Sequence, residues 1–435
     1  MRTWLRFFFS MVVVATFLFP ARIVAQEIRH FPASLSLVEA VNLALAFQPS
    51  LQASGASVKA SEASLTLARS TYYPAISITG SGTRTGGAFV FNPSLPSRIQ
   101  FYNSYTSGLT LQQTIYDFGR TDSRVSGAHE QLDASTMDYQ SLRLNVIANT
   151  AIAYYGVLEA QRVVAVNLET LAQNEAHLKE AEAYYKVGTR PQIDVTTAQV
   201  NVANANVSLI TARNQLRIAR LQLENSMGVH SDEPYELSDS LGVAAFSMTL
   251  DSVKEIALST RQDLLAAQAR VQSSESLVWS ATSQHLPTLS LSGGWNWSGF
   301  DFPLQSRWNA GVTVSLPVFQ GFGISAQVDQ AEANLEASRA SLSITIENAL
   351  LDVEQQYLSL REASDRINAT TKLVGQAEEN LKIAEGRYNF GVGSAIEITD
   401  AQVTLASARL SNIQALFDYN SSLIGLKRAM GVLEK

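Results

Sequence analysis

The sequence predicts an α+β membrane protein built from two tandem repeats, each with the order helix, strand, strand, long helix and helix. Three observations predict this fold class. Residues of the first half recur in register in the second half. Two pairs of segments alternate apolar with small polar residues, which is typical of strands with two different faces. The remaining segments carry helical patterns far longer than an average globular helix.

The internal repeat runs through nearly the whole chain. Early in each copy Pro74 aligns with Pro287, and later Gly188 aligns with Gly391. The offset between the copies changes between residues 74 and 125, where the first copy has additional Gly, Pro and Ser residues. Surface loops tolerate such insertions, so we expect a longer loop in the first repeat.

The N-terminus has the features of a signal peptide. Arg2 and Arg6 flank a short charged start, and residues 7–19 form an apolar run. This run suits a signal-peptide core and is short for a membrane span. We therefore expect residues 1–25 to be removed after Ala25 on export. A membrane-anchoring helix is the alternative.

Composition excludes several classes of function. The 435-residue chain has a net charge of −7 and no cysteine. Without a basic surface it is not expected to bind nucleic acid. Without cysteine it has no disulfide, thiolate metal site or cysteine nucleophile. Its five histidines are scattered without ligand spacing, and no nucleophile elbow or phosphate loop occurs. We expect no enzymatic activity, no cofactor and no bound metal.

The repeats divide the chain into consecutive units. We expect the first repeat at residues 26–228, a polar connector at 229–247, the second repeat at 248–431 and a short C-terminal end at 432–435. A proline ends the first helix of each repeat. The expected helices are 35–71, 117–186 and 191–227 in the first copy, and 249–284, 324–389 and 394–430 in the second.

The alternating segments, at about residues 75–115 and 288–318, are predicted to cross a membrane. Strands of about 10 residues with one apolar and one small polar face are typical of transmembrane β-barrels. One face of the last segment comprises Trp308, Ala310, Val312, Val314, Leu316 and Val318. Aromatic side chains expected at the membrane interface are Trp295, Trp297, Trp308, Tyr105 and Phe101. A half-buried sheet of a soluble protein is the alternative.

Four strands cannot close a barrel, and open edges in lipid leave backbone groups unpaired at several kcal/mol each. Other copies of the chain must therefore complete the barrel. Two copies give eight strands with a filled interior, and three give twelve strands with room for a lumen. The small polar faces favour the second solution, a homotrimer with one shared 12-stranded β-barrel.

The helices are expected to form a hollow wall. Small or apolar residues recur at alternating steps of three and four, which indicates coiled-coil packing. The longest helix spans roughly 105 Å at 1.5 Å per residue, and the two shorter helices of its repeat together match that length. A coiled-coil rod without a lumen is the alternative.

These features resemble the TolC-like outer-membrane efflux protein family over nearly all of the mature chain. The most specific stretches are residues 185–199 (YKVGTRPQIDVTTAQ) and 388–402 (YNFGVGSAIEITDAQ), which match the family's aromatic–x–x–Gly turn before an acidic helix start. The strand-to-helix stretches 113–119 and 316–323 resemble the family's Pro–aliphatic–aromatic–Gly pattern. The resemblance implies a trimeric channel with a barrel in the outer-membrane lipid and a long periplasmic α-helical barrel. It also implies passive transport of cargo supplied through a periplasmic adaptor by an inner-membrane RND or ABC-type transporter.

The resemblance also implies functional residues at the distal helix turns. Turn residues expected to dock on the adaptor are Val187, Gly188, Thr189, Phe390, Gly391 and Val392. The glycines also serve to end their helices. Arg190 and Tyr388 are the residues expected to hold a closed state. The family's arginine for this role follows the second turn, where this chain has Gly393, and Arg190 takes the corresponding place in the first copy.

Three acids are predicted to form a periplasmic gate: Asp400, Glu397 and Asp194. For two of them, helix capping or the helix dipole is an alternative explanation of the acid. Glu397 fits a capping box with Ser394, and Asp194 gains from its helix dipole. Asp400 lies nearly two turns inside its helix, where neither explanation applies. A periplasmic scaffold and an enzyme are the alternatives to an efflux channel, and the sequence leaves the cargo (drug, metal ion or protein) open.

Overall fold

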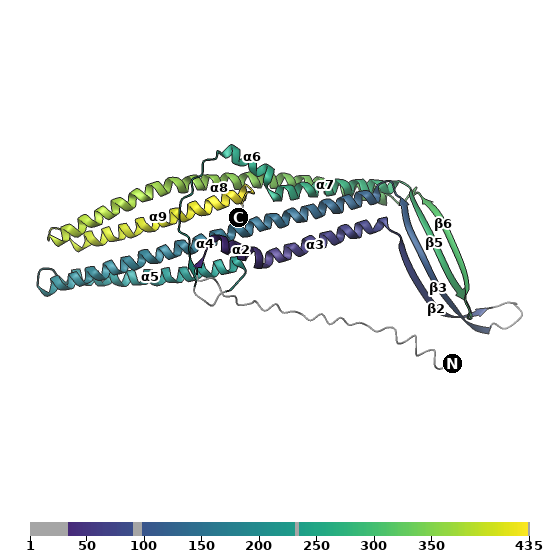
Figure 1. Cartoon of the computed structure of the whole chain (residues 1–435), viewed down its shortest axis with the longest axis horizontal. Helices are drawn as coiled ribbons and strands as arrows, with labels where there is room; N and C mark the ends of the chain where they lie inside the picture. Colours follow the sequence, from purple (N-terminus) through teal and green to yellow (C-terminus); the bar gives the residue numbers. More distant parts are fainter. Residues whose placement is uncertain (1–33, 90–97, 231–234, 434–435) are drawn as a thin grey trace.

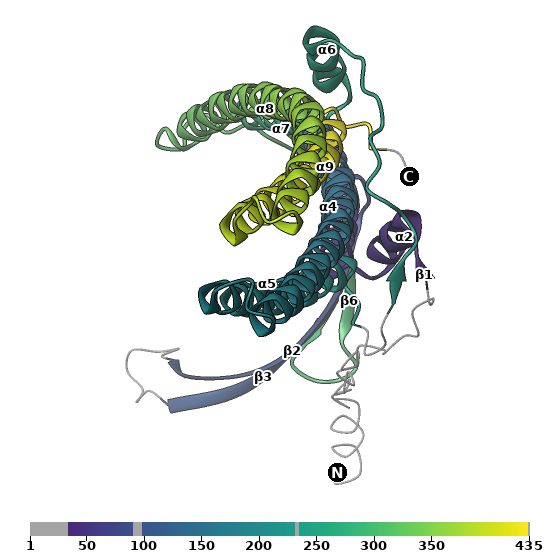
Figure 2. The same ribbon diagram turned by 90° about the vertical axis from the view of Figure 1, so that its left-hand side faces the viewer.

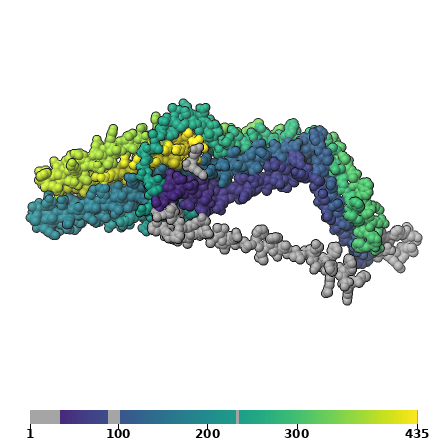
Figure 3. Space-filling view, in the orientation of Figure 1, coloured from purple at the N-terminus to yellow at the C-terminus, as the bar shows by residue number. Residues whose placement is uncertain are grey.

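The chain forms a long helical body with a four-stranded sheet at one end, which bends away from the helix axis (Figure 1). The structure, a computed structural model, describes residues 34–89, 98–230 and 235–433. The predicted signal peptide lies outside these residues. Figure 3 shows the sheet continuing the surface of the helices at an angle.

Both repeats contain the predicted order of elements. The first repeat consists of α2 (Leu37–Phe47), α3 (Pro49–Arg69), β2 (Ala75–Phe89), β3 (Arg98–Tyr116), α4 (Arg120–Lys186) and α5 (Gln192–Met227). The second consists of α6 (Leu250–Thr260), α7 (Gln262–Thr282), β5 (Thr288–Gly299), β6 (Gln305–Ser315), α8 (Gly323–Asn389) and α9 (Ala395–Ala429). Two short strands, β1 (Ser34–Leu35) and β4 (Glu236–Leu237), pair in parallel beside them.

The sheet has the strand order β2-β3-β5-β6 and is antiparallel throughout. The central β3–β5 pair joins the two repeats, so β2 and β6 are edges without a partner among the described residues. β5 and β6 have 12 and 11 residues, close to the predicted length. β2 and β3 are longer, with 15 and 19 residues, because the insertion of the first repeat extends this hairpin.

The first helix of each repeat is broken, although we predicted it to be continuous. Gln48 and Arg261 leave the helical conformation with ψ values of 118° and 122°. Pro49 accounts for the first break, because proline disfavours a helical conformation in the residue before it. At both breaks a glycine with positive φ packs closely. A Cβ on Gly228 would lie 2.9 Å from the backbone of Gln48, and one on Gly431 would lie 3.2 Å from that of Arg261.

The long helices α4 and α8 organise the packing. α4 contacts α2, α3, α5, α7 and α9, whereas α8 contacts α6, α7 and α9. Many buried positions are alanine, which lets helix axes approach closely. No helix in the described part of the chain is both long and apolar enough to cross a membrane.

Seen from the helical end, the helices follow a curved arc with α2 and α6 on its outer side (Figure 2). The buried side chain of Tyr154 ties α4 to this outer layer. Its hydroxyl donates to the Leu35 carbonyl at 2.9 Å or to Asp239 Oδ2 at 2.7 Å. The inner side of the arc is consequently the face of α4 opposite to Tyr154.

Candidate functional site

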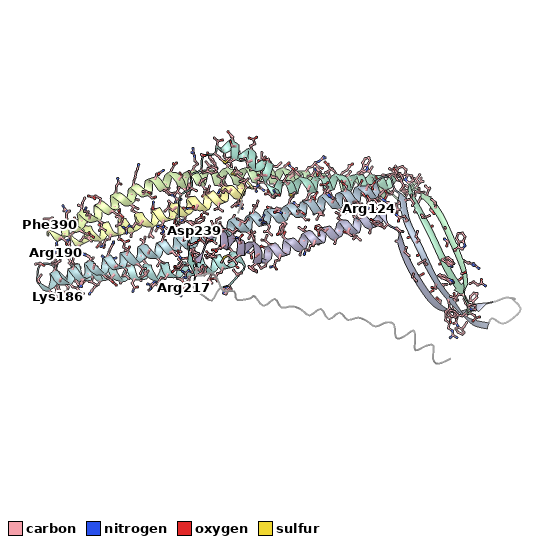
Figure 4. The ribbon with its side chains drawn as sticks, viewed as in Figure 1. Arg124, Lys186, Arg190, Arg217, Asp239 and Phe390 are labelled. Atoms are coloured by element: carbon pink, nitrogen blue, oxygen red, sulfur yellow. The ribbon has the colours of Figure 1, made fainter. Side chains whose placement is uncertain are left out.

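The two distal turns, residues 187–189 and 390–392, lie at the end of the molecule opposite to the sheet (Figure 4). Their backbone explains their sequence. Gly188 and Gly391 have φ values of 75° and 77°, which side chains other than glycine rarely adopt. Thr189 N–H donates to the Tyr184 carbonyl at 3.0 Å, and Val392 N–H closes the equivalent bond in the second turn. Both helices therefore end in a Schellman motif.

The turns present apolar side chains to solvent. Phe390 is 87% exposed, Val187 72% and Val392 68%. Nothing in the described part of the chain covers them, so folding of one chain does not account for these side chains. Exposed apolar residues gathered at one end of a protein mark a contact with a partner.

Arg190 and Tyr388 are brought together from different repeats. The guanidinium Cζ of Arg190 lies 4.5 Å from the centroid of the Tyr388 ring. Its Nη2 also lies 3.2 Å from the Tyr388 carbonyl and 3.3 Å from the Gly393 carbonyl. One arginine thus joins the α4–α5 hairpin to the α8–α9 hairpin near their tips.

Tyr388 is fully packed in this junction. Its ring meets His177 edge-on at 5.2 Å and Tyr184 at 6.1 Å between centroids. The hydroxyl has no hydrogen-bond partner among the described residues. Burial raises the pKa of Tyr388, and the nearby Asp194 raises it further. Burial likewise lowers the pKa of His177, although Glu180 and Asp194 act in the opposite direction.

The three predicted gate acids differ in their surroundings. Asp194 lies in the first turn of α5 and is partly buried. Glu397 and Asp400 are exposed on α9. The carboxylate of Asp400 has no hydrogen bond or ion pair within the described residues. It is therefore free to act on solvent or on a neighbouring chain.

The capping box predicted for Ser394 and Glu397 is only half formed. The Ser394 hydroxyl accepts from the Glu397 amide at 3.4 Å. The Glu397 carboxylate instead accepts from Arg387 Nε at 3.0 Å across the turn. An ion pair replaces the reciprocal bond because Arg387, at the end of α8, lies directly opposite the start of α9.

A polar seam between the α4–α5 and α8–α9 hairpins was not predicted from the sequence. Arg409 on α9 pairs with Glu169 on α4 at 2.7 Å and with Glu378 on α8 at 2.9 Å. Closer to the tips, Asn201 Nδ2 donates to the Thr399 hydroxyl at 3.0 Å. Charged residues on exposed helix faces are common, so no sequence signal distinguishes these residues from solvated ones.

The predicted aromatic belt lies on the sheet and the described side chains are largely exposed. Trp295 and Trp297 stack with centroids 6.0 Å apart, and Trp308 is cross-strand from Trp295. Tyr105 packs on Phe302, and Phe101 packs under Arg84. A second exposed aromatic group, which was not predicted, lies at the strand–helix junctions within residues 113–119 and 316–323. It comprises Phe118, Phe319 and Phe322.

One group of potential metal ligands occurs in the described part of the chain. The ligand atoms of His129, Glu130 and Asp133 lie within 4.8 Å of one another. All three belong to α4, and His129 and Asp133 form an i,i+4 pair at 3.3 Å. Neighbouring turns of a helix bring such side chains together without a metal.

Comparison with known proteins decides the family. A sequence model of the outer membrane efflux protein family matches residues 40–229 and 253–432, one segment in each repeat. The chain belongs to the outer membrane efflux protein family. The outer membrane protein TolC of Escherichia coli is 25% identical over 77% of this chain and 70% of its own length. The probable efflux pump outer membrane protein TtgC of Pseudomonas putida is 24% identical over 93% of this chain and 84% of its own.

Solved structures agree on the fold. The crystal structure of CusC, described as a transmembrane channel, superposes with a TM-score of 0.82, at 20% identity, over 91% of this chain and 92% of that chain. The predicted fold class is thereby confirmed for the single chain. This outer membrane efflux protein resides in the outer membrane, with a large periplasmic portion.

Proposed function

We propose that three copies of this efflux protein form one channel-tunnel, the passive exit duct of a tripartite efflux pump or type I secretion system. The open edges of the four-stranded sheet carry this proposal. β2 and β6 belong to opposite edges, so β6 of one chain is free to pair with β2 of the next. Three such contacts close a ring of twelve strands and leave no edge in lipid.

The distal turns are proposed as the docking site for a periplasmic adaptor, which links the duct to an inner-membrane RND or ABC-type transporter. The support is the exposed apolar set at the tips, led by Phe390. The transporter supplies the energy, because nothing in the described residues points to a reaction of this chain.

Closure is proposed to lie in the same region. Arg190 and Tyr388 hold the two hairpins together, and Asp194, Glu397 and Asp400 from three chains surround the periplasmic entrance. Breaking the arginine contact lets the hairpins part. The acids then determine how strongly cations are retained at the entrance.

Crosslinking between strand edges tests the assembly. Because the chain has no cysteine, introduced cysteines are the only thiols. Ser81→Cys on β2 combined with Asn309→Cys on β6, treated with a short bismaleimide in outer membranes, is expected to yield covalent species up to the trimer and none larger. Crosslinked products no larger than a dimer would indicate an eight-stranded ring, and the absence of interchain products would overturn the proposal.

A matched control uses two strands that already pair within one chain. Thr106 on β3 is opposite Ser298 on β5, so Thr106→Cys with Ser298→Cys should crosslink only inside the monomer. Membrane fractionation separates the channel from a periplasmic scaffold, because a scaffold would be released with soluble periplasmic proteins. Single-channel conductance of the purified trimer in a planar bilayer then tests transport itself.

A further inference from the structure

A cavity of about 570 Å³ lies halfway along the helical body, between α4, α5 and α9. Its walls are mainly apolar or uncharged, with one carboxyl group. The side chains that matter most are Ile152 and Glu159 on α4, Ile218 and Gln222 on α5, and Phe417 on α9, with Gly156 forming part of the floor.

This cavity opens on the inner side of the arc. Tyr154 on α4 points to the outer layer, where it binds Leu35 and Asp239. Glu159 follows five residues later, which places it roughly 140° around the helix from Tyr154 at 3.6 residues per turn. Ile152 and Gly156, two residues to either side of Tyr154, lie roughly 160° away by the same geometry.

The carboxyl group of Glu159 forms no ion pair within the described part of the chain. The described lining residues include no lysine or arginine. Burial raises the pKa of Glu159 to about 7, and the charge of Asp418 on α9 adds to the effect. Asp418 is itself paired with Arg366, whose Nη2 lies 2.6 Å from its carboxylate. Glu159 is thus a partly desolvated acid without a paired positive charge in the cavity. A cation entering the cavity would stabilise its charged form.

We propose that this cavity is a binding site for organic cations, in which the apolar body of the ligand contacts Phe417 and Ile218 and its positive charge is neutralised by Glu159. The inference rests on the proposed function, because the inner side of the arc faces the cargo only if the chain lines a tunnel. It names a cargo class: amphiphilic monovalent cations small enough for the cavity. Apolar walls with one well-placed charge are the general pattern of small-molecule sites.

Binding at this site is coupled to proton release. A cation prefers ionised Glu159, so below pH 7 the site must lose a proton before it binds. The apparent Kd should consequently weaken by about tenfold for each pH unit below the pKa. The groups that face Glu159 are uncharged or already paired, so the pH response of binding depends on Glu159. α5 contributes the uncharged Gln215 and Gln222, and α9 contributes Asp418, which is paired.

Equilibrium binding of ethidium to the purified protein in lipid nanodiscs, followed by fluorescence anisotropy, tests the proposal. The wild type should bind ethidium saturably at pH 8 and about tenfold more weakly at pH 6. Glu159→Gln should weaken binding at pH 8 by about tenfold or more and remove the pH response. Nile red, a neutral dye, should not distinguish the two proteins.

Two further variants locate the site. Ile218→Trp places a larger side chain in the cavity from α5 and retains the Glu159 carboxyl group. It should weaken ethidium binding. Glu175→Gln removes an exposed carboxylate of α4 outside the cavity and should have no effect. Absence of saturable binding by the wild type, or equal affinity in wild type and Glu159→Gln at pH 8, would overturn the proposal.

The binding assay does not depend on conductance or on a pump. A conducting trimer that fails this assay would refute only the cation site. Binding through Glu159 in a protein that neither conducts nor forms trimers would refute only the channel-tunnel. Unchanged circular dichroism and gel mobility of the variants establish that they fold.

Discussion

The guanidinium of Arg190 covers one face of the Tyr388 ring, 4.5 Å from its centroid, and also donates to the backbone carbonyl of that residue. Arg190 follows α4 in the first repeat, and Tyr388 belongs to the last turn of α8 in the second. The Arg190 side chain therefore adds a polar contact between the tips of two hairpins, which also meet where Tyr388 packs on His177 and Tyr184. Loss of this contact should change the opening of the tips more than the stability of either hairpin.

Arg190→Ala is expected to raise single-channel conductance in a planar bilayer. The change removes a cation–π contact worth about 0.5–2 kcal/mol together with two hydrogen bonds to carbonyls. At 1.4 kcal/mol per factor of ten, the open population should rise about tenfold. Tyr388→Phe is the matched control, because it keeps the ring and removes only a hydroxyl without a partner in the described residues. Wild-type conductance in Arg190→Ala would contradict a latch.

Asp400→Asn should weaken the block of the channel by multivalent cations more than Glu397→Gln does. The Glu397 carboxylate is already paired with Arg387, whereas that of Asp400 has no partner in the described part of the chain. Titration of hexaamminecobalt(III) from the periplasmic side measures the block. The double change Asp400→Ala with Glu397→Ala should also raise conductance. Unchanged conductance and block in that double variant would remove both acids from the gate.

Phe390→Ser should reduce recruitment of the adaptor without affecting the trimer. The side chain is 87% exposed, so its removal costs the isolated protein little stability. An aromatic anchor at a protein interface commonly contributes 2 kcal/mol or more, so about a thirtyfold loss of affinity is expected. Copurification with the adaptor measures it. Val200→Ser, an exposed apolar change on α5 outside the turns, is the control, and equal recruitment by both variants would speak against docking through Phe390.

Periodicity and the repeat were sufficient to predict most elements, because long amphipathic patterns and glycine-ended helices are local properties. The predicted turns at Gly188 and Gly391 coincide with the observed Schellman motifs. The break at Gln48 has a local signal in the following proline, which the sequence reasoning did not use. The break at Arg261 is followed by no proline, and Arg261 pairs there with Asp263, two residues later, and with Asp352 on α8.

Contacts between the hairpins were harder to predict. The pairing of Arg190 with Tyr388 was expected from the family resemblance, and the structure places the two residues in contact, while their role as a latch remains a prediction. Spacing alone did not reveal that Glu397 would pair with Arg387 instead of completing a capping box, because the same spacing permits both. The sequence did not single out Glu159, because its carboxyl group becomes unusual only when α5 and α9 pack beside α4.

Acidification should open the tips, and His177 should account for part of the response. Burial lowers the pKa of His177 below its ordinary value of 6.5, so the closed tip binds a proton less readily than an exposed histidine does. This contribution to closure is complete above pH 6.5 and is lost as the pH falls toward the lowered pKa. Conductance at pH 5.5 should therefore exceed that at pH 7.5.

A comparison of two histidine variants isolates this response. His177→Phe keeps an aromatic ring against Tyr388 and cannot titrate, so its conductance should depend less on pH. Glu180 and Asp194, whose charges act on the pKa of His177, are unchanged in this variant. His285→Gln, an exposed change at the sheet end, should behave as the wild type. A full pH response in His177→Phe would assign the effect to other groups.

The last prediction concerns the attachment of the outer layer to α4, and the internal repeat supplies its control. Tyr154 aligns with Tyr357, yet the Tyr154 hydroxyl is buried against Leu35 and Asp239, whereas the Tyr357 hydroxyl makes one exposed contact of 3.5 Å with the Met248 carbonyl. Tyr154→Phe removes the hydroxyl that joins the Leu35 carbonyl to Asp239. Both acceptors keep another donor, the amides of Ser238 and Leu37, so the free energy of unfolding should fall by about 0.5–1.5 kcal/mol. Tyr357→Phe should change it by less than about 0.5 kcal/mol. Urea denaturation followed by circular dichroism compares the two, and hydrogen exchange should report faster opening of β1 and β4 in Tyr154→Phe alone. Equal effects of both substitutions would mean that the aligned tyrosines act only through their rings, and the hydroxyl of Tyr154 would then have no part in fixing the outer layer to the tunnel wall.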